Sequence, residues 1–152
     1  MAQQWQLRRG TTTQHNSFTG AVGEVTVDTT THALKVHDGV KQGGYMVDTV
    51  VAYQLPTDAN DHTWYRKYAS GWVEQGGWFK ASATNTAKTI TLPVQMSDAN
   101  YNGFAIVECQ NAGDSGNALS QRTCFIRTSA TQITVSQTSS WPTQWEIKGM
   151  AA

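Results

Sequence analysis

The chain has 152 residues, and its 11 basic and 11 acidic side chains leave no formal net charge at pH 7. Charged residues make up 14% of it, against roughly 25% in an average domain, and polar uncharged residues take their place. Such a chain lacks the positive field that attracts nucleic acid or anionic lipid, which argues against both as partners. No apolar run is long enough to span a membrane or to form a signal peptide, which predicts assembly in a cytoplasm and no membrane insertion.

The first 46 residues predict a small β-module. Apolar residues alternate with polar ones, and two short apolar stretches flank a turn at Thr29 to Thr31, as in a β-hairpin. Asp38-Gly39 then forms a further tight turn, since glycine accepts a positive φ. The apolar residues of the module are Trp5, Leu7, Val25 and Val27, with Leu34 and Val36 across the hairpin.

Residues 47–152 predict an antiparallel β-sandwich. Helical periodicity is nearly absent, and alternating apolar and polar residues run between clusters of Gly, Asn, Asp and Ser. The whole chain is therefore predicted to be all-β, with a division near Gly44. The expected strands are Val47 to Gln54, His62 to Ala69, Gly71 to Lys80, Lys88 to Val94, Gly103 to Gln110, Gln121 to Thr128, Thr131 to Gln137 and Thr143 to Met150.

The module at residues 1–46 is too small to bury enough apolar surface on its own. Identical copies are its simplest partners, so we expect an intertwined, trimerising module with Trp5, Leu7, Val25 and Val27 at the common axis. The alternative is a monomer in which the hairpin docks on the sandwich.

Specific motifs in this module support the first interpretation. Arg8-Arg9-Gly10-Thr11, Gly23-Glu24-Val25, Leu34-Lys35-Val36 and Asp38-Gly39 occur at spacings that resemble the N-terminal module of phage tail-fibre and tropism-determinant proteins. The chain departs from that pattern at His37, where the family commonly has glycine.

A second resemblance covers the C-terminal part. Gly71-Trp72-Val73-Glu74-Gln75-Gly76-Gly77, Thr89-Ile90-Thr91-Leu92-Pro93 and the final Trp145 to Ala152 are similar to the C-terminal domain of certain phage tail fibres. Together the resemblances imply a non-enzymatic, homotrimeric fibre protein in the virion tail, without a cofactor. Its implied partners are other fibre proteins and a bacterial surface receptor, either a glycan or an outer-membrane protein. The alternative in the same class is a tail or baseplate accessory that binds no receptor.

The stretch "GWVEQGGWF" concentrates aromatic residues around two glycines. Trp72 is expected in the sandwich core, and the glycines allow a bulge or the close approach of a neighbouring backbone. Trp78 and Phe79 have three interpretations: a seam between subunits, which we prefer, the core of their own subunit, or an exposed platform for a ligand.

Receptor contacts are expected on loops carried by the sandwich. The candidate loops are Thr57 to Asp61, Asn111 to Ser120 with Asn111, Asp114, Ser115 and Asn117, and Thr138 to Pro142 with Trp141. A tryptophan flanked by Ser and Thr suits stacking on a sugar. Packing of Trp141 against a neighbouring strand is the alternative.

An enzymatic interpretation is weaker. Gly113-Asp114-Ser115-Gly116 resembles the nucleophile loop of chymotrypsin-like proteases, and His62 and Asp98 would complete a triad. The sequence around His62 does not support this, and a surface loop is favoured. The four histidines have no metal-binding spacing and are expected on the surface, while Cys109 and Cys124 are expected to be buried thiols rather than a disulfide.

Overall fold

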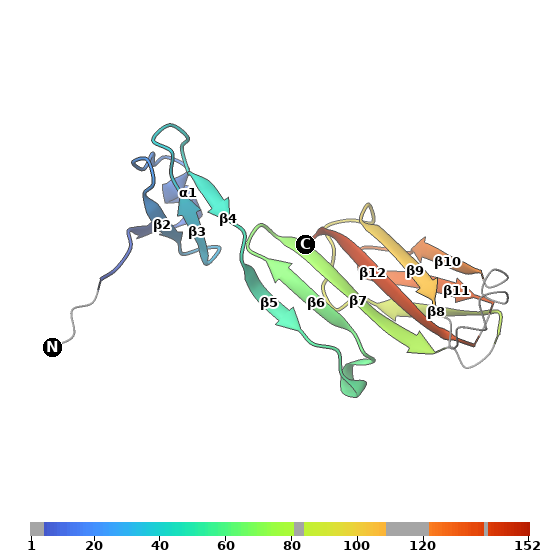
Figure 1. Cartoon of the computed structure of the whole chain (residues 1–152). Coiled ribbons are helices and arrows are strands. Elements are labelled where there is room, and N and C mark those ends of the chain that lie inside the picture. The colour runs from blue at the N-terminus through green and yellow to red at the C-terminus, as the bar shows by residue number, and fades with distance from the viewer. Residues whose placement is uncertain (1–4, 81–83, 109–121, 139) are drawn as a thin grey trace. The chain divides into compact units, whose positions relative to one another are not determined.

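A computed structural model describes residues 5–80, 84–108, 122–138 and 140–152 (Figure 1). The chain divides into two compact units. Unit 1 comprises Met1–Val51 with Tyr68–Ser70, and unit 2 comprises Ala52–Lys67 with Gly71–Ala152. Within the described ranges, no helix combines the length and the apolar character needed to cross a membrane.

Unit 1 contains a four-stranded sheet in the order β1-β2-β3-β4. The strands are β1 (Arg9–Gly10), β2 (Val25–Asp28), β3 (Ala33–Val36) and β4 (Tyr45–Val47). β1 pairs with β2 in parallel, and the other neighbours are antiparallel. Val25 lies opposite Val36 and Val27 opposite Leu34, so the predicted hairpin is confirmed in its register.

One short helix, α1 (Thr12–His15), precedes the hairpin and was not predicted. Thr11 begins it with a capping box, in which its hydroxyl accepts from the Gln14 amide and the Gln14 side chain accepts from the Thr11 amide. This Thr-x-x-Gln pattern was the available signal. The helix brings His15 into the interior of unit 1, where it is buried.

A chain of hydrogen bonds joins two buried histidines. The Gly20 amide donates to His37 Nδ1 (3.3 Å), so His37 Nε2 donates to the Thr26 hydroxyl (2.9 Å). Thr26 in turn donates to His15 Nε2 (2.8 Å), and His15 Nδ1 donates to the Thr11 carbonyl (3.0 Å). The expectation that the histidines lie on the surface is therefore wrong for His15 and His37, because each ring finds hydrogen-bond partners in the interior.

A buried ion pair lies on the same face of the sheet. Lys35 Nζ is 3.6 Å from Asp28 Oδ2, and Asp28 also accepts from the Thr12 hydroxyl and from the amides of Thr30 and Thr31. Burial raises the pKa of Asp28, but these hydrogen bonds and the charge of Lys35 outweigh it and hold the pKa below its ordinary value of 3.8.

Unit 2 contains two sheets. The five-stranded sheet has the order β5-β6-β7-β12-β9 and the three-stranded sheet the order β10-β11-β8. A 3₁₀ helix, η1 (Asp58–Asn60), lies between β5 and β6. The strands are β5 (Val50–Gln54), β6 (Trp64–Tyr68), β7 (Trp72–Lys80), β8 (Thr86–Thr91), β9 (Asn102–Val107), β10 (Thr123–Arg127), β11 (Gln132–Gln137) and β12 (Pro142–Met150).

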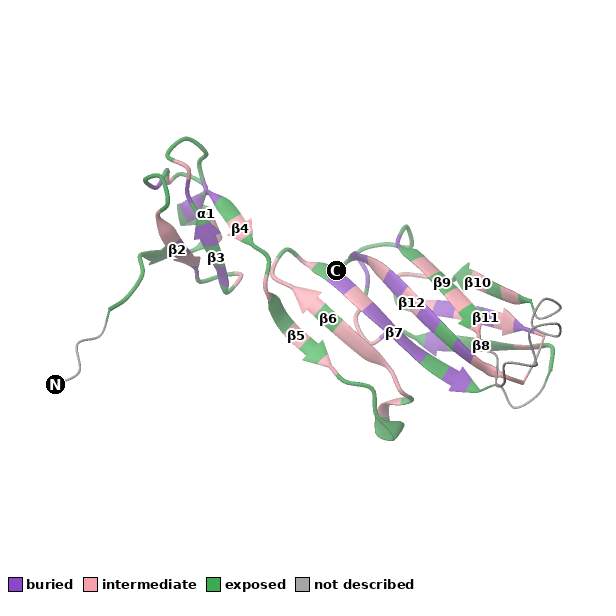
Figure 2. Cartoon of the chain, in the orientation of Figure 1, coloured by how far each residue is buried: buried purple, intermediate pink, exposed green. Residues whose placement is uncertain are grey.

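The core of unit 2 lies between these sheets. Phe79, Trp145 and Ile147 from the five-stranded sheet pack with Ile90, Ile133 and Val135 from the three-stranded sheet. Buried residues alternate with more exposed ones along β12, and also along β7 except at the buried run Gln75 to Gly77 (Figure 2). The all-β class is confirmed, and the antiparallel pairs within these two packed sheets agree with the predicted sandwich.

Two predicted strands differ from those observed: one is divided in two, and the other ends before its predicted last residue. The stretch 47–54 divides into β4 and β5, since the Asp48 carboxylate between them accepts from the amide and hydroxyl of Ser70. The stretch 88–94 ends at Thr91, and the amide and carbonyl of Val94 bond to the buried side chain of Gln75 instead of a strand. The division of the chain at residue 46 stays a prediction; it falls within β4.

Two side chains that were predicted to be buried are exposed. Trp72 is exposed on the outer face of β7, because Val73 and Gln75 occupy the core-facing positions of that strand. Cys124 is an exposed free thiol rather than a buried one, and Cys109 lies outside the described residues.

Acid is expected to destabilise unit 1 through Asp28. Because its pKa is lower in the folded unit than the ordinary 3.8, the folded state binds this proton more weakly than the unfolded state. The resulting stability is fully present above 3.8 and is lost as the pH falls through the folded pKa. Urea unfolding at about pH 6 and about pH 2.5, followed by NMR signals of the β2–β3 hairpin, should show this loss. Asp28→Asn should reduce the pH dependence and exposed Asp61→Asn should not; an unchanged dependence in Asp28→Asn would contradict the assignment.

Candidate functional site

Two adjacent glycines in β7 each make room for a tryptophan. A Cβ on Gly76 would lie 2.9 Å from Cζ2 of Trp64 and 2.6 Å from the carbonyl oxygen of Trp145. A Cβ on Gly77 would lie 3.1 Å from Nε1 of Trp145. The register of β7 with β12 is continuous, so the glycines serve close approach and do not form a bulge. Trp64 therefore rests on the outer face of the sheet at Gly76, while Trp145 is buried in the core.

Aromatic and polar side chains form two rows across the outer face of the five-stranded sheet. In the first row Trp64 lies opposite Gly76, Gly76 opposite Glu146, and Glu146 opposite Phe104. In the second row Trp78 lies opposite Gln144, and Gln144 opposite Ile106. Phe104 and Ile106 are more than half exposed, and Trp78 is 40% exposed. The outer face thus presents aromatic and apolar side chains, with the carboxylate of Glu146 and the amide of Gln144 between them.

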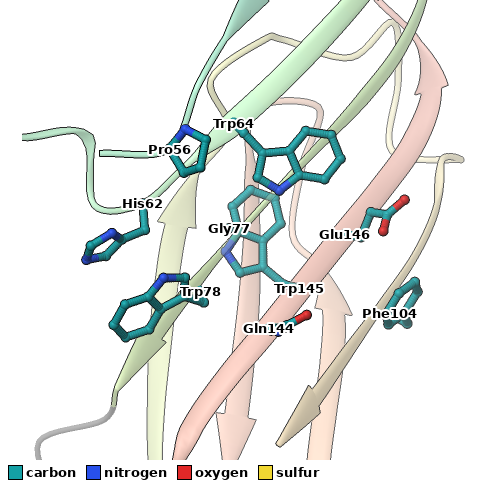
Figure 3. Close-up of a pocket in the computed structure, with 9 residues that line it drawn as sticks. All are labelled: Pro56, His62, Trp64, Gly77, Trp78, Phe104, Gln144, Trp145 and Glu146. Carbon is teal, nitrogen blue, oxygen red and sulfur yellow. The ribbon is translucent and has the colours of Figure 1, made fainter. Parts of the chain in front are cut away.

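A pocket of about 340 Å³ opens on this face (Figure 3). Trp64 and Trp78 lie on either side of Gly77, while Gln144 and Glu146 extend from β12. Its volume falls within the range of small-ligand sites, which combine aromatic walls with a few polar groups. We call this the aromatic pocket; it is lined by Pro56, His62, Trp64, Gly77, Trp78, Phe104, Gln144, Trp145 and Glu146.

The loop before β6 fixes the position of Trp78. The ring of His62 stacks on the Trp78 indole at 4.2 Å between centroids and 17° between planes. His62 Nε2 is also 3.4 Å from Asp58 Oδ1. Asp61 and His62 both have positive φ, 53° and 54°, which costs conformational energy in residues other than glycine. The loop thus holds a strained geometry that places an aromatic ring against the pocket wall.

The polar groups of the pocket have partners that orient them. Lys148 Nζ lies 2.8 Å from Glu146 Oε1 and 3.8 Å from Glu74 Oε1. The hydrogen bond to Glu146 and the charges of both carboxylates raise the pKa of Lys148. The Gln144 side chain donates to Glu108. Glu146 therefore keeps its remaining oxygen lone pairs for donors that enter the pocket.

Unit 1 has a second candidate surface, which is apolar. Pairing places Val25 and Val27 of β2 beside Val36 and Leu34 of β3, and these beside Tyr45 and Val47 of β4. Leu34 and Val36 are more than a third exposed, and Tyr45 and Val47 more than two fifths. The opposite face is polar and buried, with Thr26, Asp28, Lys35 and His37. The apolar residues Val25, Val27, Leu34, Val36, Tyr45 and Val47 are called the apolar face below.

The predicted seam residues lie in different environments. Val25 and Val27 are half-buried on the apolar face, and Trp5 and Leu7 are exposed, Trp5 by 87%. Phe79 packs in the core of its own unit, the second of its three interpretations. Trp78 faces outward beside the aromatic pocket, so the seam and the ligand platform both stay open for it.

The predicted receptor loop at Asn111, Asp114, Ser115 and Asn117 lies outside the described residues. Trp141 is half-buried, and its carbonyl accepts from the Gln137 side chain. Of the hypothetical triad, His62 stacks on Trp78, and Asp98 accepts from the Asn100 amide in a turn. The described ranges contain no group of three or more His, Cys, Asp or Glu that could hold a metal ion.

Sequence reasoning did not single out Trp64, Phe104, Gln144 and Glu146. Each lies in a predicted strand. Gln144 and Glu146 alternate with buried residues of β12, but β6 and β9 contain no buried residue that would mark the outward position of Trp64 or Phe104. Only the pairing register between strands brings these residues into the same row or into neighbouring rows. The sequence of one strand does not reveal how that strand is aligned with its neighbour. The glycine pair was the one available signal, because a glycine inside a strand marks a close approach.

Residues 6–41 match the family described as Major tropism determinant N-terminal domain. A curated relative, the "Tail fiber receptor-binding protein" of Bordetella phage BPP-1, is 55% identical over 40 residues. That alignment covers 26% of this chain and only 10% of the relative. The predicted resemblance to phage tail-fibre and tropism-determinant proteins is confirmed, and this N-terminal match carries it.

Two solved structures match parts of this chain. An N-truncated R2-type pyocin tail fibre is 17% identical, with a TM-score of 0.46, over 66% of this chain and 39% of that one. The Major Tropism Determinant I1 variant is 32% identical, with a TM-score of 0.27, over 41% of this chain and 20% of that one. Both TM-scores lie below 0.5, and the fold described above rests on strand order and burial alone.

Substitution of Gly76 should disturb both the fold and the pocket. In Gly76→Ala the new methyl group meets a backbone oxygen at 2.6 Å, and we expect a loss of about 1–3 kcal/mol in the free energy of unfolding. Gly77→Ala, whose nearest contacts lie at 3.1 Å, is the matched control and should cost less. Urea unfolding followed by tryptophan fluorescence measures both. Equal stability of Gly76→Ala and the unsubstituted chain would contradict the close approach of the Trp145 carbonyl and the Trp64 ring to Gly76.

Proposed function

We propose that this chain is a non-enzymatic host-attachment protein of a phage or prophage tail, which self-associates through unit 1 and binds a bacterial surface glycan through unit 2. The observation that carries the proposal is the match of residues 6–41 to the tropism-determinant N-terminal domain. The relative that shares this segment is described as a tail-fibre receptor-binding protein. A place in the virion tail, after assembly in the host cytoplasm, and contacts with other fibre proteins follow from the same proposal.

The apolar face supports self-association. Among the described residues of unit 1, Ala33 is the one hydrophobic side chain that is fully buried. Four residues of the apolar face, Leu34, Val36, Tyr45 and Val47, are exposed instead. A contiguous apolar surface on a small unit is a mark of an interaction site. Copies of the same chain offer a matching apolar surface, and closed symmetry would cover all of them at once. A homotrimer is the assembly we propose.

The aromatic pocket supports glycan binding. A sugar ring has an apolar face of C–H groups and a rim of hydroxyl groups, so it needs an aromatic surface together with hydrogen-bond acceptors and donors. Trp64 and Trp78 supply the aromatic surface, and Glu146 and Gln144 supply the polar groups. An uncharged sugar also suits a chain without net charge. We therefore propose the platform interpretation for Trp78.

The attachment proposal predicts that pocket variants lose binding to host cells. Trp64→Ala and Trp78→Ala each remove stacking surface, and we expect about 10- to 30-fold weaker binding for each. Glu146→Gln should weaken binding less, because the amide keeps one acceptor. Fluorescently labelled protein on a panel of bacterial strains, with purified surface polysaccharide as competitor, gives the measurement.

Trp72→Ala is the matched control for these variants, since it also lies outward on β7 but does not line the pocket. Unchanged binding by Trp64→Ala would contradict the pocket as the receptor site. A change in molecular mass in Trp78→Ala would favour the seam interpretation. Binding by no strain in the panel would favour the accessory protein that contacts no receptor.

Self-association predicts a mass of three chains in solution. Leu34→Lys places a charge in the centre of the apolar face and should reduce the mass to that of one chain, because a buried unpaired charge is costly. Gln42→Lys, at an exposed polar position of the same unit, should leave the mass unchanged. Light scattering after size exclusion measures the mass. A monomer for the unsubstituted chain would overturn the self-association.

A further inference from the structure

A second pocket, besides the aromatic pocket of unit 2, lies in unit 1 and is separate from the apolar face. It has a volume of about 270 Å³ and lies between β1, α1 and β2. Phe18 forms an apolar wall, and the guanidinium carbon of Arg8 lies 5.0 Å from the centroid of its ring. We call it the β1 pocket; it is lined by Arg8, Arg9, Gly10, Gln14, His15, Phe18 and Thr26.

The polar atoms in its floor already have partners within the chain. The Gln14 side-chain oxygen accepts from the Thr11 amide, and both nitrogens of His15 are hydrogen-bonded. The Thr26 hydroxyl bonds to His15 and His37. A ligand therefore gains little from hydrogen bonds to this floor. A flat apolar ring fits better, because the two arginine side chains at the rim can lie against its face.

The segment just before β1 supplies such a ring. Trp5 and Leu7 are exposed by 87% and 53% and lie two residues apart in the irregular stretch that leads into β1. Trp5 has the largest exposed fraction among the large hydrophobic residues that the structure describes. The residues that separate it from β1 are exposed and contain no Gly, Pro or Asn to reverse the chain.

We infer that Trp5 of one copy inserts into the β1 pocket of a second copy. The inference rests on the proposed self-association and adds a partner residue to a site that is incomplete in one chain. Insertion buries an exposed indole beside Phe18 and against the outer face of the Arg8 guanidinium, which Glu24 already holds at 3.2 Å. β1 has two residues and a single parallel partner, so the arm that precedes it has few contacts to lose when it reaches across.

Cross-linking between differently tagged chains tests the insertion. In a background of Cys109→Ser and Cys124→Ser, one tagged chain carries Trp5→Cys and the other carries Gln14→Cys, and both are co-expressed. A short bis-maleimide linker should join the two chains, giving a product with both tags. Val22→Cys, 82% exposed and outside the pocket, replaces Gln14→Cys in the matched control and should give little of this product.

Trp5→Ala and Trp5→Phe give an independent measurement that needs no cysteine. Trp5→Ala should lower the association constant at least about 10-fold, and Trp5→Phe should restore most of it, since a ring still fills the pocket. Chains that associate without a two-tag product overturn the insertion and leave the proposed self-association intact. A cross-link within one chain carrying both cysteines also overturns it. A monomeric unsubstituted chain overturns the self-association itself.

Discussion

The pairing of β7 with β12 is the interaction on which unit 2 depends. These strands are the longest in the unit, they lie next to each other in the five-stranded sheet, and every residue from 72 to 80 has a partner from 142 to 150. Because side chains alternate along both strands, one pairing fixes two surfaces. The inner surface takes Phe79 and Trp145 into the core, and the outer surface carries Trp78 and Glu146 at the pocket. A shift of one residue would exchange the two surfaces.

Unit 1 solves the folding problem in the opposite way. Its buried face is held by hydrogen bonds from His37 through Thr26 to His15 and by the Asp28–Lys35 pair, and its apolar side chains remain outside. Buried polar groups are costly unless every one is paired, so such an interior specifies one arrangement but adds little net stability. Under the proposed self-association, copies of the chain would supply the missing hydrophobic burial by covering the apolar face.

Much of the fold could be predicted from the sequence because period-2 alternation is a local property. It located the strands of unit 2 to within a few residues and set the register of the Val25–Val36 hairpin. It failed at Trp72, where both faces of β7 carry aromatic residues, and the burial of Gln75 through its bonds to Val94 decided the orientation. The pocket was not predicted, since Trp64, Gly76 and Glu146 meet only through pairing between distant segments. The buried histidines were missed because their partners Thr11, Gly20 and Thr26 come from separate segments, which meet only in the folded unit.

The two units use aromatic and apolar surface for different ends, and the chemistry of each surface separates them. The apolar face of unit 1 has no charged member, so it gains most from complete removal from water by a similar surface. The aromatic pocket contains the carboxylate of Glu146. Lys148 forms ion pairs with both Glu146 and Glu74. Covering this carboxylate with another protein chain would cost desolvation unless donors replaced the water. A ligand rich in hydroxyl groups provides those donors and keeps the ion pair hydrated at its edge. The chemistry of the two surfaces therefore fits the proposed division, in which unit 1 serves assembly and unit 2 serves recognition.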